Sequence, residues 1–552
     1  MGLLDPQPPP YSPTEWLKLP LSERGRMACE AWAMQGYGTP PAAYAMYLVK
    51  IALYIGGWVL ACSFSASLGG PSTIGTWWLS PLAFQKAIVW SLCFEVMGLG
   101  CGSGPLTARY FPPVGGALYF FRPGTTKLPF FPGIPVLGGR TRSILDVLLY
   151  AALLGACVRV LVASAPGPEL YLPIAILLPI LGLTDKTIFL AARSEHYWVT
   201  VICFLFPQWI AGAKIVQLAL WFWAGASKLN HHFPTVSCVM TSNAPLTRMG
   251  WLRRMMYRDY PRDVRPSKFA AWLAHGGTGL EFAVPIAFLL TQVLAPGQPP
   301  VVAILLMLAL HSFITSNVPM GVPLEWNVMV VYGGFALFWA HPDVSVFTLG
   351  PWYLSAFVLF MAIGLPLLGN MYPARISFLL AMRYYAGNWA YSVWLFKGTS
   401  HQKLEKLTKT SPWIHDQLAH FYDKKTALGL LSKVMGFRMM HLHGRALPLL
   451  VPKAVDGHLS EYEWLDGEVV AGLVLGWNFG EGHLHHEQLL ESIQAQCGFE
   501  EGELRCIFVE SQPIFSDVMS YRIADAKKGN LERGELSVKE LRTRQPWLAT
   551  VE

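Results

Sequence analysis

Several polar residues interrupt long apolar segments of this sequence, and their types could support chemistry inside a membrane. The first is Lys228, in AGASKLN at 224–230, which lies on the last turn of an apolar run. A lysine acts as a general base only where burial disfavours its charged form. The other interpretation is that its stem lies along lipid while the ammonium reaches water. The three small residues Ala224, Gly225 and Ala226 are expected to let a neighbouring helix approach closely.

Two later segments carry further polar groups. His275 opens LAHGGTGLEFAVP at 273–285, and Glu281 follows six residues later, so the two side chains lie on different helix faces. A carboxylate inside a span is costly and usually faces a partner or a cavity. His311 lies in the middle of the next apolar run, where a histidine is a functional candidate. The alternatives are a helix cap for His275 and hydrogen bonds between packed helices for Glu281 and His311. The three glycines at 276, 277 and 279 are expected to form a tight packing face.

The sequence contains, in this order, AGxxKL, then HGG with an acid on the same helix, then a mid-helix histidine. In this arrangement it resembles the vitamin K-dependent γ-glutamyl carboxylase and its bacterial HTTM-domain relatives. The likeness covers about residues 190–345. It implies an HTTM-like helical bundle in which Lys228 is the base that deprotonates a reduced, vitamin K-like quinone. By the same likeness, His275 and His311 match histidines that line the quinone cavity, and together with Glu281 they complete the predicted catalytic set. The predicted cofactor contacts nearby are Trp223, Asn230 and Asn317.

The sequence departs from that family at several positions. Ser227 stands where the family often has a first lysine, Ile314 replaces an asparagine, and the family's large lumenal domain has no counterpart here. We therefore expect a membrane oxidoreductase or carboxylase-type enzyme that acts on a quinone or lipid, rather than carboxylation of peptide glutamate.

The composition identifies the class of protein that must position these groups. Of 552 residues, 53% are hydrophobic and only 14% are charged, whereas soluble domains carry about 25% charged residues. A spanning helix needs about 20 apolar residues. The candidate spans are 43–63, 82–102, 145–164, 169–184, 188–207, 211–228, 277–294, 300–317, 326–340 and 352–369. The sequence thus predicts an integral, multi-pass membrane protein of about ten helices. The run 188–207 is the weakest, because Arg193, Glu195 and His196 interrupt it, and a short or re-entrant segment is the alternative.

The positive charges predict the orientation. Arginines and lysines gather in the loops 103–144 and 229–267, while the loops 165–168 and 295–299 carry almost no charge. By the positive-inside rule, both termini are expected in the cytoplasm. The same distribution accounts for the net charge of +7 without nucleic acid as a partner.

The chain divides into four predicted parts. Residues 1–42 form an N-terminal extramembrane segment, and 43–370 form the transmembrane bundle. Residues 371–396 mix aromatics with arginines, which favours an interfacial amphipathic helix, with an eleventh span as the alternative. From 397 to 552 the composition becomes polar, with short apolar runs bounded by glycines. The predicted fold is therefore an all-α polytopic membrane protein with a small C-terminal α+β domain outside the membrane.

The C-terminal part holds a dense group of histidines. If these segments are strands, alternate side chains share a face, so His441 with His443, or His483 with His485, could bind a metal ion. Their spacing matches no standard zinc site, and solvated histidines in a polar turn are the other interpretation. The nine cysteines include no CxxC pair, so no disulfide framework is expected.

Three functions remain open on the sequence. A membrane enzyme requires Lys228, His275, Glu281 and His311 to converge on one pocket. A transporter of lipids or small molecules requires access from both sides of the membrane. A structural subunit of a membrane complex requires exposed apolar patches and no shared pocket. The expected partners are membrane lipids, a lipid-soluble small molecule and other subunits.

Overall fold

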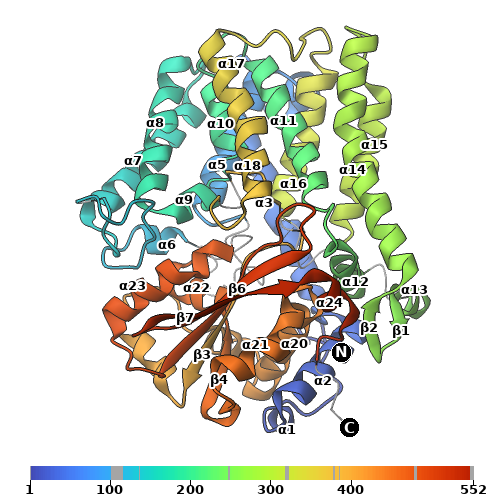
Figure 1. Ribbon diagram of the computed structural model, residues 1–552. Helices are drawn as coiled ribbons and strands as arrows, with labels where there is room; N and C mark the ends of the chain where they lie inside the picture. Colours follow the sequence, from blue (N-terminus) through green and yellow to red (C-terminus); the bar gives the residue numbers. More distant parts are fainter. Residues whose placement is uncertain are drawn as a thin grey trace.

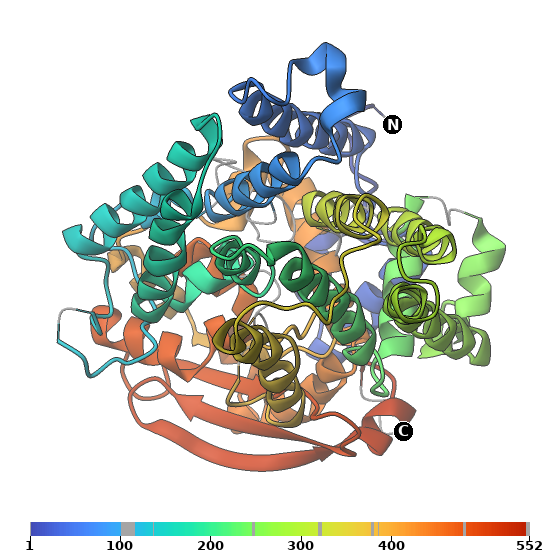
Figure 2. The same cartoon turned by 90° about the horizontal axis from the view of Figure 1, so that it is seen from above.

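The computed structural model describes residues 2–100, 116–135, 137–245, 249–317, 323–376, 380–384, 386–477 and 482–547. A bundle of helices forms one half of the molecule and a mixed α/β domain forms the other (Figure 1). Seen from above, many helices of the bundle are viewed nearly along their axes, so they run in roughly the same direction (Figure 2).

The N-terminal helices belong to the α/β half. Helix α1 (Pro13–Trp16) and helix α2 (Leu21–Gln35) pack against helix α20 (Lys424–Met440). The Nζ atom of Lys433 on α20 donates to the carbonyls of Gln7 (2.6 Å) and Tyr37 (3.1 Å), which fixes the segments on both sides of α1 and α2. Burial lowers the pKa of Lys433 to about 7.

The bundle contains helices of very different lengths. Its helices, with the short connecting helices, are α3 (Pro41–Ser63), α4 (Ile74–Trp77), α5 (Pro81–Val96), α6 (Ala117–Phe120), α7 (Ile144–Val162), α8 (Pro168–Thr184), α9 (Lys186–Ala191), α10 (Tyr197–Cys203), α11 (Trp209–Ala226), α12 (Phe233–Asn243), α13 (Gly250–Met256), α14 (Lys268–Leu294), α15 (Val301–Thr315), α16 (Leu324–Gly333), α17 (Trp352–Leu359) and α18 (Leu365–Met371). A short hairpin of β1 (Tyr257–Asp259) and β2 (Asp263–Pro266) precedes α14.

Five helices in the described residues are long and apolar enough to cross a membrane, so the predicted count of about ten is not confirmed. They are Pro41–Ser63, Ile144–Val162, Trp209–Ala226, Lys268–Leu294 and Trp352–Met371, and the last runs from α17 through a π-helical turn into α18. Two shorter apolar helices, α8 and α15, accompany them. The difference arises because α5, α8, α15 and α16 are 16, 17, 15 and 10 residues long, and because the run 188–207 is broken into two short buried helices.

The run 188–207 is the clearest example. It folds into α9 and α10, joined by a turn in which Arg193 adopts a positive φ of 43°. Arg193, Glu195 and His196 are all buried. Charged groups inside a bundle need polar neighbours, and the turn brings the Arg193 guanidinium to 3.2 Å from Glu95 on α5. The single span predicted at 188–207 is therefore wrong, and the short-segment alternative describes it better.

The C-terminal half is built on one five-stranded antiparallel sheet with the strand order β4-β3-β5-β6-β7. The strands are β3 (Tyr391–Lys397), β4 (Tyr462–Asp466), β5 (Leu504–Val509), β6 (Val518–Asp525) and β7 (Gly529–Ser537). The remaining helices are α19 (Ile414–Ala419), α20, α21 (Leu447–Ala454), α22 (Gly467–Leu475), α23 (Glu487–Cys497) and α24 (Val538–Thr543). The predicted α+β composition of this part agrees with these elements.

The internal strand β3 explains why helices cover both faces of the sheet. Alternate residues of a strand point to opposite faces. Trp394 and Phe396 pack in one hydrophobic core with α22 and α23, and Val393 and Leu395 pack in another with α20 and α21. The first core is continuous with bundle residues such as Tyr150. The bundle and the sheet domain therefore share buried apolar surface.

The amphipathic helix predicted over 371–396 is not found in the described residues of that segment. Helix α18 ends at Met371, and β3 begins at Tyr391. The aromatic residues at 391–396 instead belong to strand β3 of the sheet. An eleventh span is excluded by the same strand.

Candidate functional site

A cavity of about 210 Å³ lies where the bundle meets the sheet domain. Its walls come from the end of α11, from α12 and α14, from the end of α15, from the start of α16 and from the end of α20. Most of the lining is apolar. The residues with polar side chains on it are Arg193, Lys228, Ser237, Thr241, Glu281, Asn317, Trp326, Tyr384 and His441.

Lys228 and Glu281 form an ion pair on the wall of this cavity. The Nζ atom of Lys228 donates to Oε2 of Glu281 on α14, and the ammonium lies 5.7 Å from the ring centroid of Phe233. The side chains are only 16% and 5% exposed, respectively. Lys228 therefore does not extend along lipid to bulk water. Its ammonium neutralises a carboxylate that α14 holds inside the protein.

Close packing of α11 on α14 makes this contact possible. Helix α11 ends at Ala226, and Lys228 follows in the next turn. A Cβ atom added to Gly225 would lie 3.3 Å from the ring of Phe282 on α14. The small residues at 224–226 thus permit the close helix approach that the sequence indicated.

His275 lies away from the cavity. Ala274, Gly277 and Glu281 line it at the spacing i, i+3, i+7, and His275 is one position off this stripe, on the exposed face of α14. The glycines do not form the predicted tight packing face, because a Cβ atom on Gly276, Gly277 or Gly279 would meet nothing within 4 Å. The missing side chain at Gly277 instead leaves space at the cavity wall.

His311 forms a hydrogen-bonded network between helices. Nε1 of Trp221 donates to its Nε2 atom at 2.9 Å, so the ring proton is on Nδ1, which lies 2.5 Å from Oδ1 of Asn327. The amide of Asn327 also donates to Thr315, one turn beyond His311. Both ring nitrogens are engaged, and the side chain is 5% exposed. The structure therefore favours the alternative of a hydrogen bond between packed helices, since His311 is not on the cavity lining.

The three predicted cofactor contacts have different environments. Asn317 lines the cavity. Trp223 does not, because its Nε1 atom donates to the carbonyl of Ala362 at 2.7 Å and its ring packs beside Ala362, in the π-helical turn between α17 and α18. Asn230 is buried and binds the loop after β5: its amide donates to the carbonyls of Gln512 (3.2 Å) and Pro513 (3.4 Å) and accepts from the backbone N–H of Phe515 (2.9 Å). Asn230 therefore joins the bundle to the sheet domain.

Sequence reasoning missed Arg193 and Trp326 as cavity residues. The guanidinium of Arg193 lies 5.2 Å from the ring centroid of Trp326, whose Nε1 atom donates to Nδ1 of His196 at 3.2 Å. The signal was present, because an arginine within an apolar run points to a functional or paired position. It was instead interpreted as a weakness of the predicted span.

His441 and His443, the first predicted metal pair, are buried at the boundary between the two halves. Nδ1 of His441 donates to the carbonyl of Phe437 at 2.7 Å, and its ring reaches the cavity wall. The ring of His443 stacks on Trp389 with an interplanar angle of 10°. Burial lowers the pKa of His441 to about 3 and that of His443 to about 4, so both rings are neutral. They do not belong to the group of metal-ligand atoms found in the described residues.

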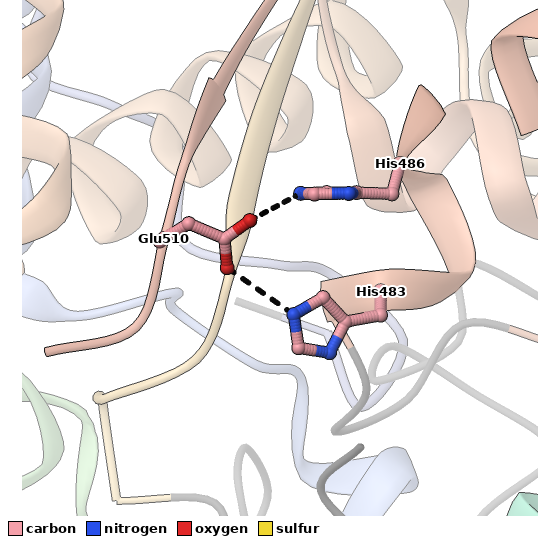
Figure 3. Close-up of side chains that lie close together, drawn as sticks. All are labelled: His483, His486 and Glu510. Carbon is pink, nitrogen blue, oxygen red and sulfur yellow. Dashed lines mark hydrogen bonds and ion pairs between the residues drawn. The ribbon is translucent and has the colours of Figure 1, made fainter. Parts of the chain in front are cut away.

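The second predicted metal pair, His483 with His485, is replaced by the pair His483 with His486. The segment Gly482–His485 is a 3-10 turn rather than a strand, so residues three apart share a face. His483 therefore lies beside His486, and both face Glu510 (Figure 3). His485 is fully buried on the other side, where its Nδ1 atom lies 2.7 Å from Oγ of Ser392. The predicted pairing of His483 with His485 is wrong for this reason.

Glu510 and Glu487 keep their charge next to these histidines. Burial would raise the pKa of Glu510, but its interactions with His483 and His486 outweigh burial and hold that pKa well below its usual range. Burial likewise opposes ionisation of Glu487, and its contacts with His486 and Arg522 lower its pKa to about 2. Glu510 could not be singled out in the sequence, because it lies 24 residues or more from the histidines and meets them only in the folded domain.

Comparisons with known proteins give one match. The family model described as "Transmembrane protein of unknown function (DUF3556)" matches residues 1–552. No curated protein and no solved structure matches the chain. None of these findings supports the resemblance to the γ-glutamyl carboxylase or to HTTM-domain proteins, which stays a hypothesis.

Proposed function

We propose that this chain, which belongs to the DUF3556 family of transmembrane proteins, takes the polar head of a lipid-soluble small molecule into the cavity at Lys228 and Glu281 and acts on it as a membrane enzyme. The observation that carries the proposal is an ion pair on the wall of a mostly apolar cavity. Sites for small molecules combine apolar walls with a few convergent polar groups in this way.

The size of the cavity supports a ring-sized head with its tail outside. An apolar cavity of about 150 Å³ holds a benzene molecule, so 210 Å³ accommodates one substituted ring but not a long chain. The tail of such a molecule would extend from the cavity toward lipid. Figure 1 places the contributing ends of α11, α14 and α15 at the end of the bundle that meets the sheet domain.

A reduced quinone is the class of ligand that we propose for this space. The residues present fit it, because a ring-sized cavity ends on a paired acid and base and is bordered by Phe313 and Trp326. A bound hydroquinone would supply an acidic hydroxyl and two electrons, and dioxygen would be the acceptor of those electrons. Oxidation of a reduced quinone or lipid by dioxygen is thus the proposed reaction class, and carboxylation is the more distant one.

The ion pair defines what Lys228 must do to act as a base. As an ammonium it has no lone pair, so its proton has to pass first to the carboxylate of Glu281, which its Nζ atom already contacts. The neutral amine could then accept a proton from a hydroxyl in the cavity, which would restore the ammonium. In this proposal Glu281 stores one proton, and His311 positions α11, α15 and α16 without touching the ligand.

We also propose that the sheet domain is cytoplasmic. The N-terminal helices, the sheet domain, α6 and the β1–β2 hairpin lie at the same end of the bundle (Figure 1). The described parts of the arginine-rich loops 103–144 and 229–267 lie at that end, and the positive-inside rule would assign it to the cytoplasm.

The test is to purify the full chain in mild detergent and identify its bound small molecules by mass spectrometry. The decisive variant is Gly277→Leu, which fills the cavity without altering the ion pair. Gly279→Leu is the matched control, because that glycine is on the same helix, also faces open space and does not line the cavity. Lys228→Met tests the polar end.

We expect a quinone-like or isoprenoid molecule in the wild type and in Gly279→Leu, and its loss from Gly277→Leu and Lys228→Met. Equal amounts of bulk phospholipid in all four proteins would refute the proposal and favour the transporter or subunit alternatives. Loss from Gly277→Leu alone would keep the cavity but remove Lys228 from the site.

A further inference from the structure

We propose that His483, His486 and Glu510 bind a divalent transition-metal ion, of the zinc or ferrous-iron class, in the C-terminal domain. This site is separate from the cavity at Lys228, and the inference does not depend on the proposed function. The set of two histidines and one carboxylate leaves coordination positions open for water or a substrate, as in catalytic metal sites.

The three side chains converge as ligands of one ion would. Nε2 of His486 lies 3.0 Å from Oε1 of Glu510, and Nε2 of His483 lies 3.2 Å from Oε2. The candidate ligand atoms of all three residues are within 4.8 Å of one another. Ligands about 2.1 Å from a metal ion lie about 3.0 Å apart at right angles and about 3.4 Å apart at tetrahedral angles. The two separations between histidine nitrogens and Glu510 oxygens fall in this range, and the ligand nitrogens of the two histidines lie within 4.8 Å of each other.

The backbone holds this geometry from two independent elements. The 3-10 turn at Gly482–His485 places His483 and His486 one turn apart, immediately before α23. Glu510 follows the last residue of β5, and its backbone N–H donates to the carbonyl of Ser520 at 2.8 Å. Figure 3 shows the two rings directed at different oxygens of the same carboxylate.

A further carboxylate orients one of the histidines. Nδ1 of His486 contacts Glu487, which leaves Nε2 directed at the proposed metal position. Metal-binding histidines commonly donate their other ring N–H to a carboxylate in this way. Glu510 is almost fully buried, whereas the side chains of His483 and His486 are 16% and 13% exposed, which gives an ion a path from solvent.

Arg522 is the competing cation. Its Nη2 atom lies 2.6 Å from Oε1 of Glu510 and 2.9 Å from Nε2 of His486, and its Nε atom contacts Glu487. A divalent ion at this position would be coordinated by Nε2 of His486 and by Glu510, which Nη2 of Arg522 now contacts, so the guanidinium has to withdraw from both while it keeps Glu487.

This competition gives a sharp test by calorimetric titration of the metal-stripped full chain with Zn²⁺. We expect one Zn²⁺ per chain, binding at least tenfold weaker in His483→Ala and Glu510→Gln, and binding as tight or tighter in Arg522→Gln. The control is His458→Ala, since that histidine is 67% exposed and lies outside the group. The proposal would be overturned if the wild type showed no saturable binding of Zn²⁺, or if His483→Ala and Glu510→Gln both bound Zn²⁺ as tightly as the wild type. It would also be overturned if Arg522→Gln lost binding while its fold stayed intact.

A second measurement uses only the wild-type protein, in case a variant does not fold. Diethyl pyrocarbonate modifies accessible histidines, and mass spectrometry locates the modified rings. Zn²⁺ should protect His483 and His486 and leave His458 reactive. Equal modification of all three with and without Zn²⁺ would show that the group is an ion-pair network in which Arg522 is the only cation.

Discussion

Replacing Lys228 with methionine should destabilise the protein through the carboxylate that it leaves behind. Glu281 is 5% exposed and paired with Lys228, and removing one partner of a buried pair costs about 3–5 kcal/mol. Protonation limits that penalty: a carboxyl group that titrates near pH 4.3 in water costs about 3.7 kcal/mol to protonate at pH 7 and about 1 kcal/mol at pH 5. We therefore expect a loss of about 3 kcal/mol at neutral pH that shrinks to about 1 kcal/mol at pH 5.

The assay is unfolding of the detergent-solubilised chain, followed by tryptophan fluorescence at both pH values. The double variant Lys228→Met/Glu281→Gln should recover most of the loss, because neither charge remains; a coupling of about 1–3 kcal/mol is expected for groups in contact. Lys18→Met is the control, since the Lys18–Glu15 pair is 70% and 68% exposed and should contribute nothing measurable. The buried ion pair would be refuted if Lys228→Met lost no more stability than Lys18→Met. It would also be refuted if the loss of stability were the same at both pH values and were not reduced by Glu281→Gln.

Two more predictions follow from contacts outside the cavity. Asn230→Ala removes three hydrogen bonds to residues 512–515. Backbone hydrogen exchange in that loop should therefore accelerate at least tenfold, while exchange in α20 stays unchanged. Equal exchange of the loop in the variant and the wild type would contradict the role of Asn230. The pKa of Lys433 is about 7 in the folded protein and about 10.4 in the unfolded chain. Between these two pH values the unfolded chain binds more protons than the folded protein. The free energy of unfolding should therefore rise with pH, by at most about 1.4 kcal/mol per pH unit. That slope, measured from pH 7 to 9, should disappear in Lys433→Met, and identical slopes in both proteins would disprove it.

The sequence was informative about which polar groups are buried, but not about which groups meet. Lys228 and Glu281 were both identifiable, because each interrupts an apolar segment, yet their pairing depends on the packing of α11 against α14. The same limit applies to His311, whose partners Trp221 and Asn327 come from two other helices. Contacts between distant segments follow from helix packing, which periodicity in one segment does not encode.

Local conformation caused the other errors. The pairing predicted for His483 assumed a strand, and a 3-10 turn changes the shared face from every second to every third residue. The aromatic residues near 391–396 were assigned to a membrane interface, although aromatic and β-branched residues equally favour a strand that is buried on both faces. The count of about ten spans is not confirmed, and composition cannot settle it, because an apolar segment inside a large core has the same composition as one facing lipid.

The packing of α2 on α20 has a consequence for how the chain is made. Trp32 of α2 is fully buried, and its ring lies 5.2 Å from that of Phe437 on α20. Roughly 390 residues separate the two helices, so at about 5–20 residues per second a ribosome needs roughly 20–80 s to deliver the partner of α2. Helix α12, which also packs on α2, is made earlier, but the side of α2 that faces α20 stays uncovered until the described membrane-spanning helices have been synthesised. The packing of α2 is therefore completed only after the bundle has been made.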